Sequence, residues 1–207
     1  PVARPAGMDE PRVGELGSGS DYTPFLQHLG VPALDISFGG AYGVYHAVYD
    51  NFYWMEKFGD PTFKYGVAAA QVYGTLALRL AAADVLPFDY EDYGKSVQEY
   101  LNRLEQEMKG RQEAEKLRFD AAKAVAAKFT EVAAKLGGAI AEVSSRGIVD
   151  RESLATVNHA LLEVERTFLL PDGLPGRAWF RHAFYAPGVY TGYEAVILPG
   201  IREAVEK

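Results

Sequence analysis

The sequence contains no cysteine, which removes several classes of protein from consideration. Without thiols there is neither a disulfide framework nor a thiolate metal site, so any bound metal must be held by His, Asp or Glu. Positive charge is also scarce, because 28 acidic residues outnumber 21 basic ones and the net charge is -7. Such a chain has no electrostatic basis for binding nucleic acid or an anionic membrane surface, so we expect no nucleic-acid partner.

Long apolar runs are missing as well. The longest apolar stretch, residues 67–86, is interrupted by Gln71, Arg79 and Asp84, which is unsuitable for a membrane span and typical of a packed soluble helix. Residues 1–11 lack the basic-then-apolar layout of a signal peptide, and the chain does not begin with Met. We therefore expect the natural start of the protein to lie upstream.

The first 86 residues combine helix and strand patterns. Asp21 is predicted to cap a helix over Tyr22–Leu29, which Gly30 ends. The segment Val31–Phe38 is short, apolar and bounded by glycines, which is typical of a buried strand in an α/β sheet. Asp60, followed by proline, predicts the start of another helix. This part of the chain is thus predicted to be α/β.

A domain boundary is predicted near residues 86–88, because strand patterns disappear there and helical periodicity takes over. Asp89 is predicted to cap the next helix and Asp150 a later one. Between them we expect a longer helix that runs through Gly137–Gly138, since its apolar spacing continues beyond them. The residues expected on its apolar face are Leu117, Ala121, Val125, Val132 and Leu136. Residues 87–207 are predicted to form an α-helical bundle, which makes the chain mostly helical.

A long segment rich in glycine, proline and aromatic residues, 169–199, precedes a last helix predicted to start near Gly200. Loops of this length inside a compact domain are usually functional. The helix before it has apolar residues at alternating steps of three and four, a seam typical of packing in a bundle or against a partner. These residues are Leu154, Val157, Leu161, Val164 and Phe168.

The sequence has four histidines, at 28, 46, 159 and 182, and His46 is the strongest candidate for a metal ligand. It lies in a glycine- and tyrosine-rich loop after the predicted strand, where open α/β sheets place their sites. Asp50 follows as a carboxylate that can orient the imidazole. A lone histidine is more often an ordinary core or surface residue, and His28 and His159, on predicted helices, are assigned that structural role.

Two further features bear on chemistry. Most tyrosines are expected to pack in the core, but Tyr45, beside His46, is placed to donate a hydrogen bond to the oxyanion formed when metal-bound water attacks a peptide carbonyl. The turn Gly17–Ser20 matches neither a dinucleotide loop, a phosphate loop nor a nucleophile elbow, and no HExxH helix occurs. Taken without any resemblance, these residues indicate only an α/β fragment with a helical bundle and a candidate metal site.

Several separated blocks resemble the glutamate carboxypeptidase II and transferrin receptor family of co-catalytic zinc peptidases, and their order and spacing agree with it. They are GSGSDYTPFLQHLGVPAL (17–34), YHAVYDNFYWMEKFGDPTFKY (45–65), LPFDYEDY (86–93) and LLPDGLPGRAWFRHAFYAPGVYTGYEAVILPGI (169–201). The resemblance implies that residues 1–86 are the C-terminal part of the zinc peptidase α/β domain, a portion of an αβα sandwich. It implies that residues 87–207 are the helical dimerisation domain, truncated at its C-terminus.

The resemblance also implies a metal and a reaction. Such enzymes hold two zinc ions and use a glutamate as general base on the bridging water, and their last zinc ligand is the histidine of a Tyr-His pair. Here that pair makes His46 the zinc ligand and Tyr45 the stabiliser of the oxyanion. The other ligands and the glutamate have no counterpart in this chain. Because one ligand cannot hold a zinc site, we expect the chain alone to be inactive.

Four residues are implied to bind the peptide or dipeptide substrate. Ser18, Gly19 and Ser20 match the family loop that hydrogen-bonds the substrate, and Tyr193 matches a tyrosine that reaches its terminal carboxylate. Ser20 stands where glutamate-cleaving members have asparagine.

Three other positions depart from the glutamate-specific pattern. Gly192 replaces a lysine, and Asp35 and Ser37 stand where arginines are found. Burying a substrate carboxylate without a cation is costly, so we expect neutral or apolar terminal residues to be preferred over glutamate.

The favoured interpretation is a zinc carboxypeptidase that acts as a homodimer through the helical domain. The alternative is a non-catalytic receptor-like scaffold of the transferrin receptor type, and a third interpretation makes the chain a dimerisation module only. The retained Tyr45-His46 pair favours the enzyme. For location the resemblance indicates an extracellular, periplasmic or membrane-anchored protein, while the residues themselves leave the compartment open.

Overall fold

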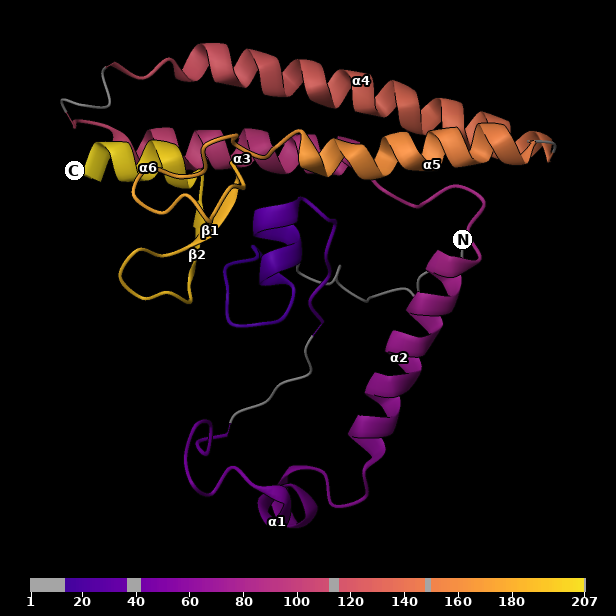
Figure 1. Cartoon of the computed structure of the whole chain (residues 1–207), viewed down its shortest axis with the longest axis vertical. Coiled ribbons are helices and arrows are strands. Elements are labelled where there is room, and N and C mark those ends of the chain that lie inside the picture. The colour runs from indigo at the N-terminus through magenta and orange to yellow at the C-terminus, as the bar shows by residue number, and fades with distance from the viewer. Residues whose placement is uncertain (1–13, 37–41, 112–115, 148–149, 207) are drawn as a thin grey trace. The chain divides into compact units, whose positions relative to one another are not determined.

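The computed structural model describes residues 14–36, 42–111, 116–147 and 150–206. Helices dominate these residues, as predicted, and the extended structure they contain is a two-stranded antiparallel sheet (Figure 1). In the labels below, η marks a π-helix. The elements in chain order are η1 Pro24–Leu29, α1 Phe52–Trp54, η2 Met55–Gly59, α2 Lys64–Ala81, α3 Tyr90–Met108, α4 Phe119–Arg146, α5 Arg151–Arg166, β1 Tyr185–Pro187, β2 Ala195–Ile197 and α6 Pro199–Glu206.

The chain divides into two compact units. Unit 1 comprises Pro1–Asp35, Asp89–Ala139 and Leu162–Lys207, and unit 2 comprises Ile36–Phe88 and Ile140–Leu161. The helices α4 and α5 each contribute residues to both units. Each unit is described by itself below.

The core of unit 1 is built on one face of α3. The helix begins where predicted, because the Asp89 side chain accepts a hydrogen bond from the Asp92 N–H at 2.9 Å. Its apolar positions recur every three or four residues and turn inward together, with Leu104 at 0% exposure. They pack with residues of α4 and with residues in and just before α6. This cluster consists of Val97, Leu101, Leu104, Met108, Phe119, Ala126, Leu198 and Val205.

Helix α4 crosses α3 closely at Gly94. A Cβ at this position would lie 2.4 Å from Thr130 Oγ1 and 3.0 Å from Phe129 Cδ1, so only glycine fits. The helix continues through Gly137–Gly138 to Arg146, which confirms the predicted continuation. Its predicted apolar face is wrong, however. Ala126 and Ala133 are buried, whereas Val125, Val132 and Leu136 are exposed, because the close approach of the two helices leaves room only for small side chains.

Helix α5 begins after Asp150, whose side chain accepts a hydrogen bond from the Ser153 N–H at 2.9 Å, as predicted. Its predicted seam is only partly covered, since Leu161 is buried while Val157 is exposed. The helix is followed by a segment that leads into the antiparallel strands β1 and β2, which pair Tyr185 with Ile197. The last helix, α6, begins at Pro199, next to the predicted Gly200.

The predicted strand Val31–Phe38 is not formed. Residues 31–36 are irregular, and residues 37 and 38 lie outside the described residues. A buried strand must pair its N–H and C=O groups with neighbouring strands, and the part of the chain that the structure describes offers it none. The described residues therefore do not assemble an αβα sandwich.

Unit 2 is centred on α2, which starts three residues later than the sequence predicts. Residues 61–63 form a turn first, and the Asp60 carboxylate accepts the Gly66 N–H at 2.9 Å from outside the helix. Apolar side chains of α2, among them Val67, Val72 and Leu78, are exposed. No helix within the described residues is long and apolar enough to cross a membrane.

Candidate substrate-binding loop and zinc ligand

The glycine-serine turn at residues 17–20 lies in unit 1, where it packs against the loop that joins β1 and β2. We call residues 188–194 the hairpin loop. Gly17 is buried, and a Cβ on it would lie 2.5 Å from the Tyr193 carbonyl oxygen and 2.7 Å from the Ala195 nitrogen. Gly19 has φ +91°, in the left-handed region that favours glycine. Both glycines are therefore required by the geometry of this contact.

Ser18 joins the turn to the hairpin loop by two hydrogen bonds. Its backbone N–H donates to the Tyr193 carbonyl oxygen at 3.2 Å, and its hydroxyl donates to the Gly192 carbonyl oxygen. The loop is closed internally as well, because the Gly192 N–H donates to the Gly188 oxygen at 2.9 Å. Two segments from opposite ends of the chain thus form one surface.

The turn is also held by η1. Gln27 is fully buried, and its side-chain amide donates to the carbonyl oxygens of Leu16, at 3.3 Å, and Gly17. Its own carbonyl oxygen accepts the Arg181 N–H at 2.8 Å. Gly30 ends η1 in the left-handed conformation, with φ +63°, as predicted.

His28, on the same helix, has the structural role assigned to it. Its ring stacks on Trp179 with centroids 5.0 Å apart, and Nδ1 lies 2.8 Å from the Trp179 carbonyl oxygen, to which it donates.

Tyr193 lies directly over the turn. A Cβ on Gly19 would be 2.7 Å from Tyr193 Cε1, so the phenol ring occupies the space that any side chain at residue 19 would fill. Tyr193 is 54% exposed, and Ser20, which follows Gly19 in the turn, is also exposed. The structure thus brings together all four residues implied to bind substrate: Ser18, Gly19, Ser20 and Tyr193.

Tyr45 and His46 lie together in unit 2. Their rings stack with centroids 3.9 Å apart at an interplanar angle of 19°. His46 has φ +59°, an unfavourable backbone conformation for a residue with a side chain, and both residues are exposed. Asp50 is also exposed, and its N–H donates to the Ala47 oxygen at 3.0 Å.

The described residues alone do not fit a zinc ion. Across residues 14–36, 42–111, 116–147 and 150–206, no group of three or more His, Asp or Glu side chains is arranged to hold a metal. His46 offers a single imidazole, whereas zinc sites use three or four protein ligands.

A buried histidine–glutamate pair beside the hairpin is a feature that sequence reasoning missed. His182 is 0% exposed, and its Nε2 lies 2.8 Å from Glu165 Oε1 on α5. The Phe184 N–H donates to His182 Nδ1 at 3.2 Å, so Nδ1 carries no proton and Nε2–H donates to the carboxylate. No motif marks this pair, because 17 positions separate the two residues and only the fold joins them.

Tyrosines and phenylalanines surround this pair. Tyr185 stacks on His182 with centroids 5.4 Å apart, and Tyr93 stacks on Phe168 at 5.2 Å. Burial raises the pKa of the Tyr93 and Tyr185 phenols far above the usual value, since the charged phenolate loses its hydration. Burial also raises the pKa of Tyr90 to about 12. These phenols therefore stay uncharged at neutral pH and pack around the buried pair.

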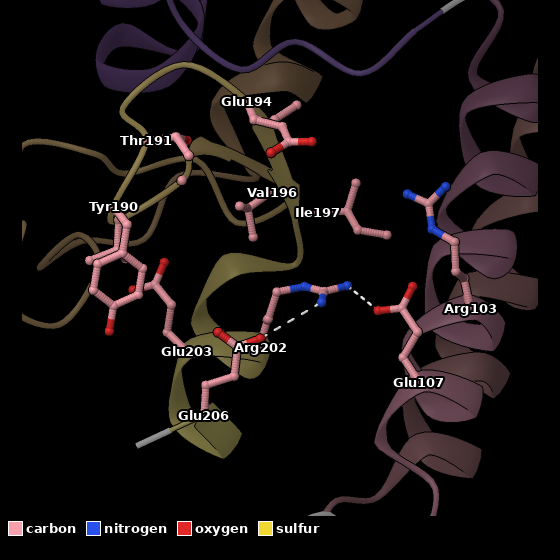
Figure 2. Close-up of a pocket in the computed structure, with 13 residues that line it drawn as sticks. Arg103, Glu107, Tyr190, Thr191, Glu194, Val196, Ile197, Arg202, Glu203 and Glu206 are labelled. Atoms are coloured by element: carbon pink, nitrogen blue, oxygen red, sulfur yellow. Dashed lines mark hydrogen bonds and ion pairs between the residues drawn. The ribbon is translucent and has the colours of Figure 1, made fainter.

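A pocket of about 550 Å³ lies on another side of the hairpin, between α3 and α6 (Figure 2). Its arginines are already paired, Arg202 with Glu107 and Arg103 with Glu15. Glu203, also in its wall, pairs with the largely buried Arg177. None of the residues predicted to bind substrate or zinc lines this pocket.

Comparison with known proteins identifies relatives of this chain. Residues 117–207 match the model of the transferrin receptor-like dimerisation domain. The chain is 38% identical over 191 residues to "Probable glutamate carboxypeptidase LAMP1" of Arabidopsis thaliana, which covers 92% of this chain and 27% of that protein.

Two other relatives give the same picture. "Probable glutamate carboxypeptidase VP8" of Zea mays is 35% identical, over 91% of this chain and 26% of that protein. "Aminopeptidase NAALADL1" of Mus musculus is 29% identical, over 94% of this chain and 27% of that protein. The chain thus spans about a quarter of the length of the curated relatives it matches.

Proposed function

We propose that this chain, which matches the transferrin receptor-like dimerisation domain over residues 117–207 and is similar to glutamate carboxypeptidases, is the C-terminal part of a zinc-dependent exopeptidase that removes one residue from a peptide. The observation that carries the proposal is the contact between the turn at residues 17–20 and Tyr193. These are the residues implied to hold the substrate, and they meet although they lie at opposite ends of the chain.

The shared surface of the turn and the hairpin loop binds the terminal carboxylate of the peptide. A carboxylate only accepts hydrogen bonds, so it requires donors. The phenol of Tyr193 and the hydroxyl of Ser20 are exposed donors, and among the described residues neither has a hydrogen-bond partner. Gly19 has no side chain, so the Tyr193 ring can pack directly against the turn.

The chemistry at the peptide bond involves Tyr45 and His46. His46 contributes one zinc ligand, and residues outside this chain supply the others together with the general base. The phenol of Tyr45 donates a hydrogen bond to the peptide carbonyl oxygen as negative charge develops on it. The stacking of Tyr45 on His46 supports this assignment, because it keeps the phenol next to the metal ligand.

Residues 14–86 form part of an αβα sandwich in the whole enzyme. The exposed apolar residues of α2, such as Val67 and Leu78, support this, since a helix of a soluble protein normally buries its apolar face against a sheet or another helix. Strands contributed from outside the chain also provide partners for residues 31–36.

The selectivity of the site favours neutral or apolar terminal residues. Gly192, at φ +67°, brings no cation to the hairpin loop, and Asp35 adds negative charge to unit 1. Ser37, the third position of this argument, lies outside the described residues. A glutamate side chain of the substrate would therefore be desolvated without a partner.

The protein acts as a homodimer through its dimerisation domain. Val125, Val132 and Leu136 are spaced by seven and four residues, so they form one stripe along α4, and all three are exposed. Val125 is 71% exposed. Burial of this stripe against a second copy would remove apolar surface from water, the main driving force for association.

The reaction is tested by expressing the chain together with the coding sequence that precedes it, and by following release of the terminal residue from dipeptides. We expect hydrolysis that stops after zinc is chelated and returns when zinc is added. We also expect a higher kcat/KM for leucine-terminated than for glutamate-terminated dipeptides. Absence of hydrolysis in the zinc-loaded protein would reject the function, and a strong preference for glutamate would reject the selectivity.

The dimer is tested by light scattering at micromolar concentration. We expect the mass of a dimer, and we expect Val132→Glu to reduce it to that of a monomer by burying a charge in the interface. The matched control is Ala127→Glu, an equally charged change on the opposite side of α4 at another exposed position. A monomer mass for the unmodified protein contradicts the proposal.

A further inference from the structure

Ser18 has no hydrogen-bond donor left for a substrate carboxylate. A serine offers two donors, its backbone N–H and its hydroxyl proton. In this structure the first donates to the Tyr193 oxygen at 3.2 Å and the second to the Gly192 oxygen. Ser18 therefore differs from Ser20, whose hydroxyl has no partner among the described residues.

The two acceptors of Ser18 lie next to each other in the hairpin loop, and one of them belongs to Tyr193 itself. The loop is otherwise held by its own bonds, from the Gly188 N–H to the Glu194 oxygen at 2.8 Å and from the Gly192 N–H to the Gly188 oxygen at 2.9 Å. These bonds close the loop but do not fix it over the turn. Ser18 supplies the polar contacts that fix the loop over the turn.

The turn that carries Ser18 is itself anchored. Gln27, fully buried, donates to the carbonyl oxygens of Leu16 and Gly17, and neither bond involves the hairpin loop. Gly17 allows the two backbones to approach, because a Cβ there would lie 2.5 Å from the Tyr193 oxygen. The turn is therefore held by bonds that do not involve the loop, and the loop is positioned on it.

We propose that Ser18 is a positioning residue, which holds the Tyr193 phenol over Gly19 so that Tyr193 and Ser20 present a preformed pair of donors to the substrate's terminal carboxylate. This inference rests on the proposed function. In it Ser18 acts through Tyr193 and does not contact the substrate directly. Preorganised donors bind an anion without the cost of ordering the loop at each encounter.

Amide hydrogen exchange on this chain tests the positioning step without substrate or metal. In Ser18→Ala we expect the amides of Gly188 and Gly192 to exchange about fivefold faster, the change that follows from losing one neutral hydrogen bond of about 1 kcal/mol. Ser18→Thr keeps the hydroxyl and should restore slow exchange. Ser20→Ala, the matched control, should leave both rates unchanged. Equal rates in Ser18→Ala and the unmodified chain, or equal acceleration by Ser20→Ala, would overturn the proposal.

A double-mutant cycle in the active peptidase tests the link to Tyr193. We expect Ser18→Ala to raise KM several-fold when Tyr193 is intact. The same change should have little further effect in the Tyr193→Phe background, because Ser18 acts through that phenol. Additive losses would mean that Ser18 contacts the substrate itself, and would overturn the inference. Failure of the proposed function is distinguishable, since it removes all hydrolysis and leaves the exchange rates unaffected.

Discussion

Unit 1 and unit 2 differ in how much of their apolar surface they bury. In unit 1 the inward face of α3 is covered by α4 and by the region around α6, and Leu104 has no exposure. In unit 2 the apolar side chains of α2 remain exposed, with Leu78 at 72%. An amphipathic helix is stabilised mainly by packing, so the comparison indicates that unit 1 holds most of the stability of this chain. Unit 2 carries Tyr45 and His46, the residues proposed to act in the reaction, and leaves the apolar side chains of α2 uncovered.

The largest expected effect is a loss of core packing in unit 1. Leu104→Ala should lower the free energy of unfolding by about 2 to 5 kcal/mol, because it leaves a cavity in a fully buried position. Leu78→Ala, the same change on the exposed face of α2, should alter it by less than about 0.5 kcal/mol. Urea denaturation followed by circular dichroism measures both. Similar losses in the two variants would mean that the units are equally well packed.

The next effect concerns the charged pairs of the two units. Glu165→Ala should cost about 1 to 3 kcal/mol, since it leaves the buried His182 Nε2–H without an acceptor. Glu165→Gln keeps an acceptor oxygen and should cost less. Glu142→Ala removes an exposed pair with Arg146 in unit 2 and should have almost no effect. Thermal unfolding distinguishes the three, and a Glu165→Ala variant as stable as Glu142→Ala would show that the buried pair is dispensable.

A glycine-to-alanine substitution should have opposite effects on stability in α3 and in α2. Gly94→Ala forces a Cβ to within 2.4 Å of Thr130 Oγ1 and should destabilise unit 1 by about 1 to 3 kcal/mol. Gly74→Ala meets no atom within 4 Å, and should stabilise α2 by about 0.5 to 1 kcal/mol through helix propensity. Helical circular dichroism during denaturation reports both changes. Destabilisation by Gly74→Ala would reveal a partner for that face of α2.

The smallest effect is a dependence on alkaline pH confined to unit 1. Burial raises the pKa of Tyr90 to about 12 from its usual value of 10.0, so the folded state retains the phenol proton to higher pH than the unfolded state. This contribution to stability is complete below pH 10.0 and is lost as the pH rises towards about 12. Tyr90→Phe, which cannot ionise, should show a smaller decline in the denaturation midpoint over that range. An identical decline in both proteins would exclude Tyr90 as its source.

Several parts of the fold that depend on neighbouring residues were predictable from the sequence. The predicted Asp21 cap was wrong, because η1 begins after Thr23 without a side-chain cap hydrogen bond, and α2 starts three residues late. Asp89 and Asp150 cap helices as expected, because a cap is a hydrogen bond to a residue three positions away. Gly30 likewise ends η1 for a local reason. Parts that depend on distant residues were not predictable in this way. Residues 31–36 were expected to be a strand, but strand formation requires partners that the pattern alone does not supply.

The inward face of α4 shows the same limit. Hydrophobicity favoured Val125 and Val132, yet the close approach of α3 at Gly94 selects the smaller Ala126 and Ala133. The residues proposed to bind substrate could be named only through resemblance to a family, since nothing in the spacing of Ser18 and Tyr193 indicates that they meet. The buried contact of His182 with Glu165 had no signal at all, because it is created by the tertiary fold.

The most direct test of the proposed enzyme is the effect of His46→Ala on zinc-dependent hydrolysis by the chain expressed with its preceding sequence. We expect this variant to lose activity and to bind one zinc ion fewer, because an imidazole ligand is removed from the site. His159→Ala, at an exposed position on α5, should retain both activity and zinc. Full activity and unchanged zinc content in His46→Ala would contradict the assignment of this chain to a zinc exopeptidase.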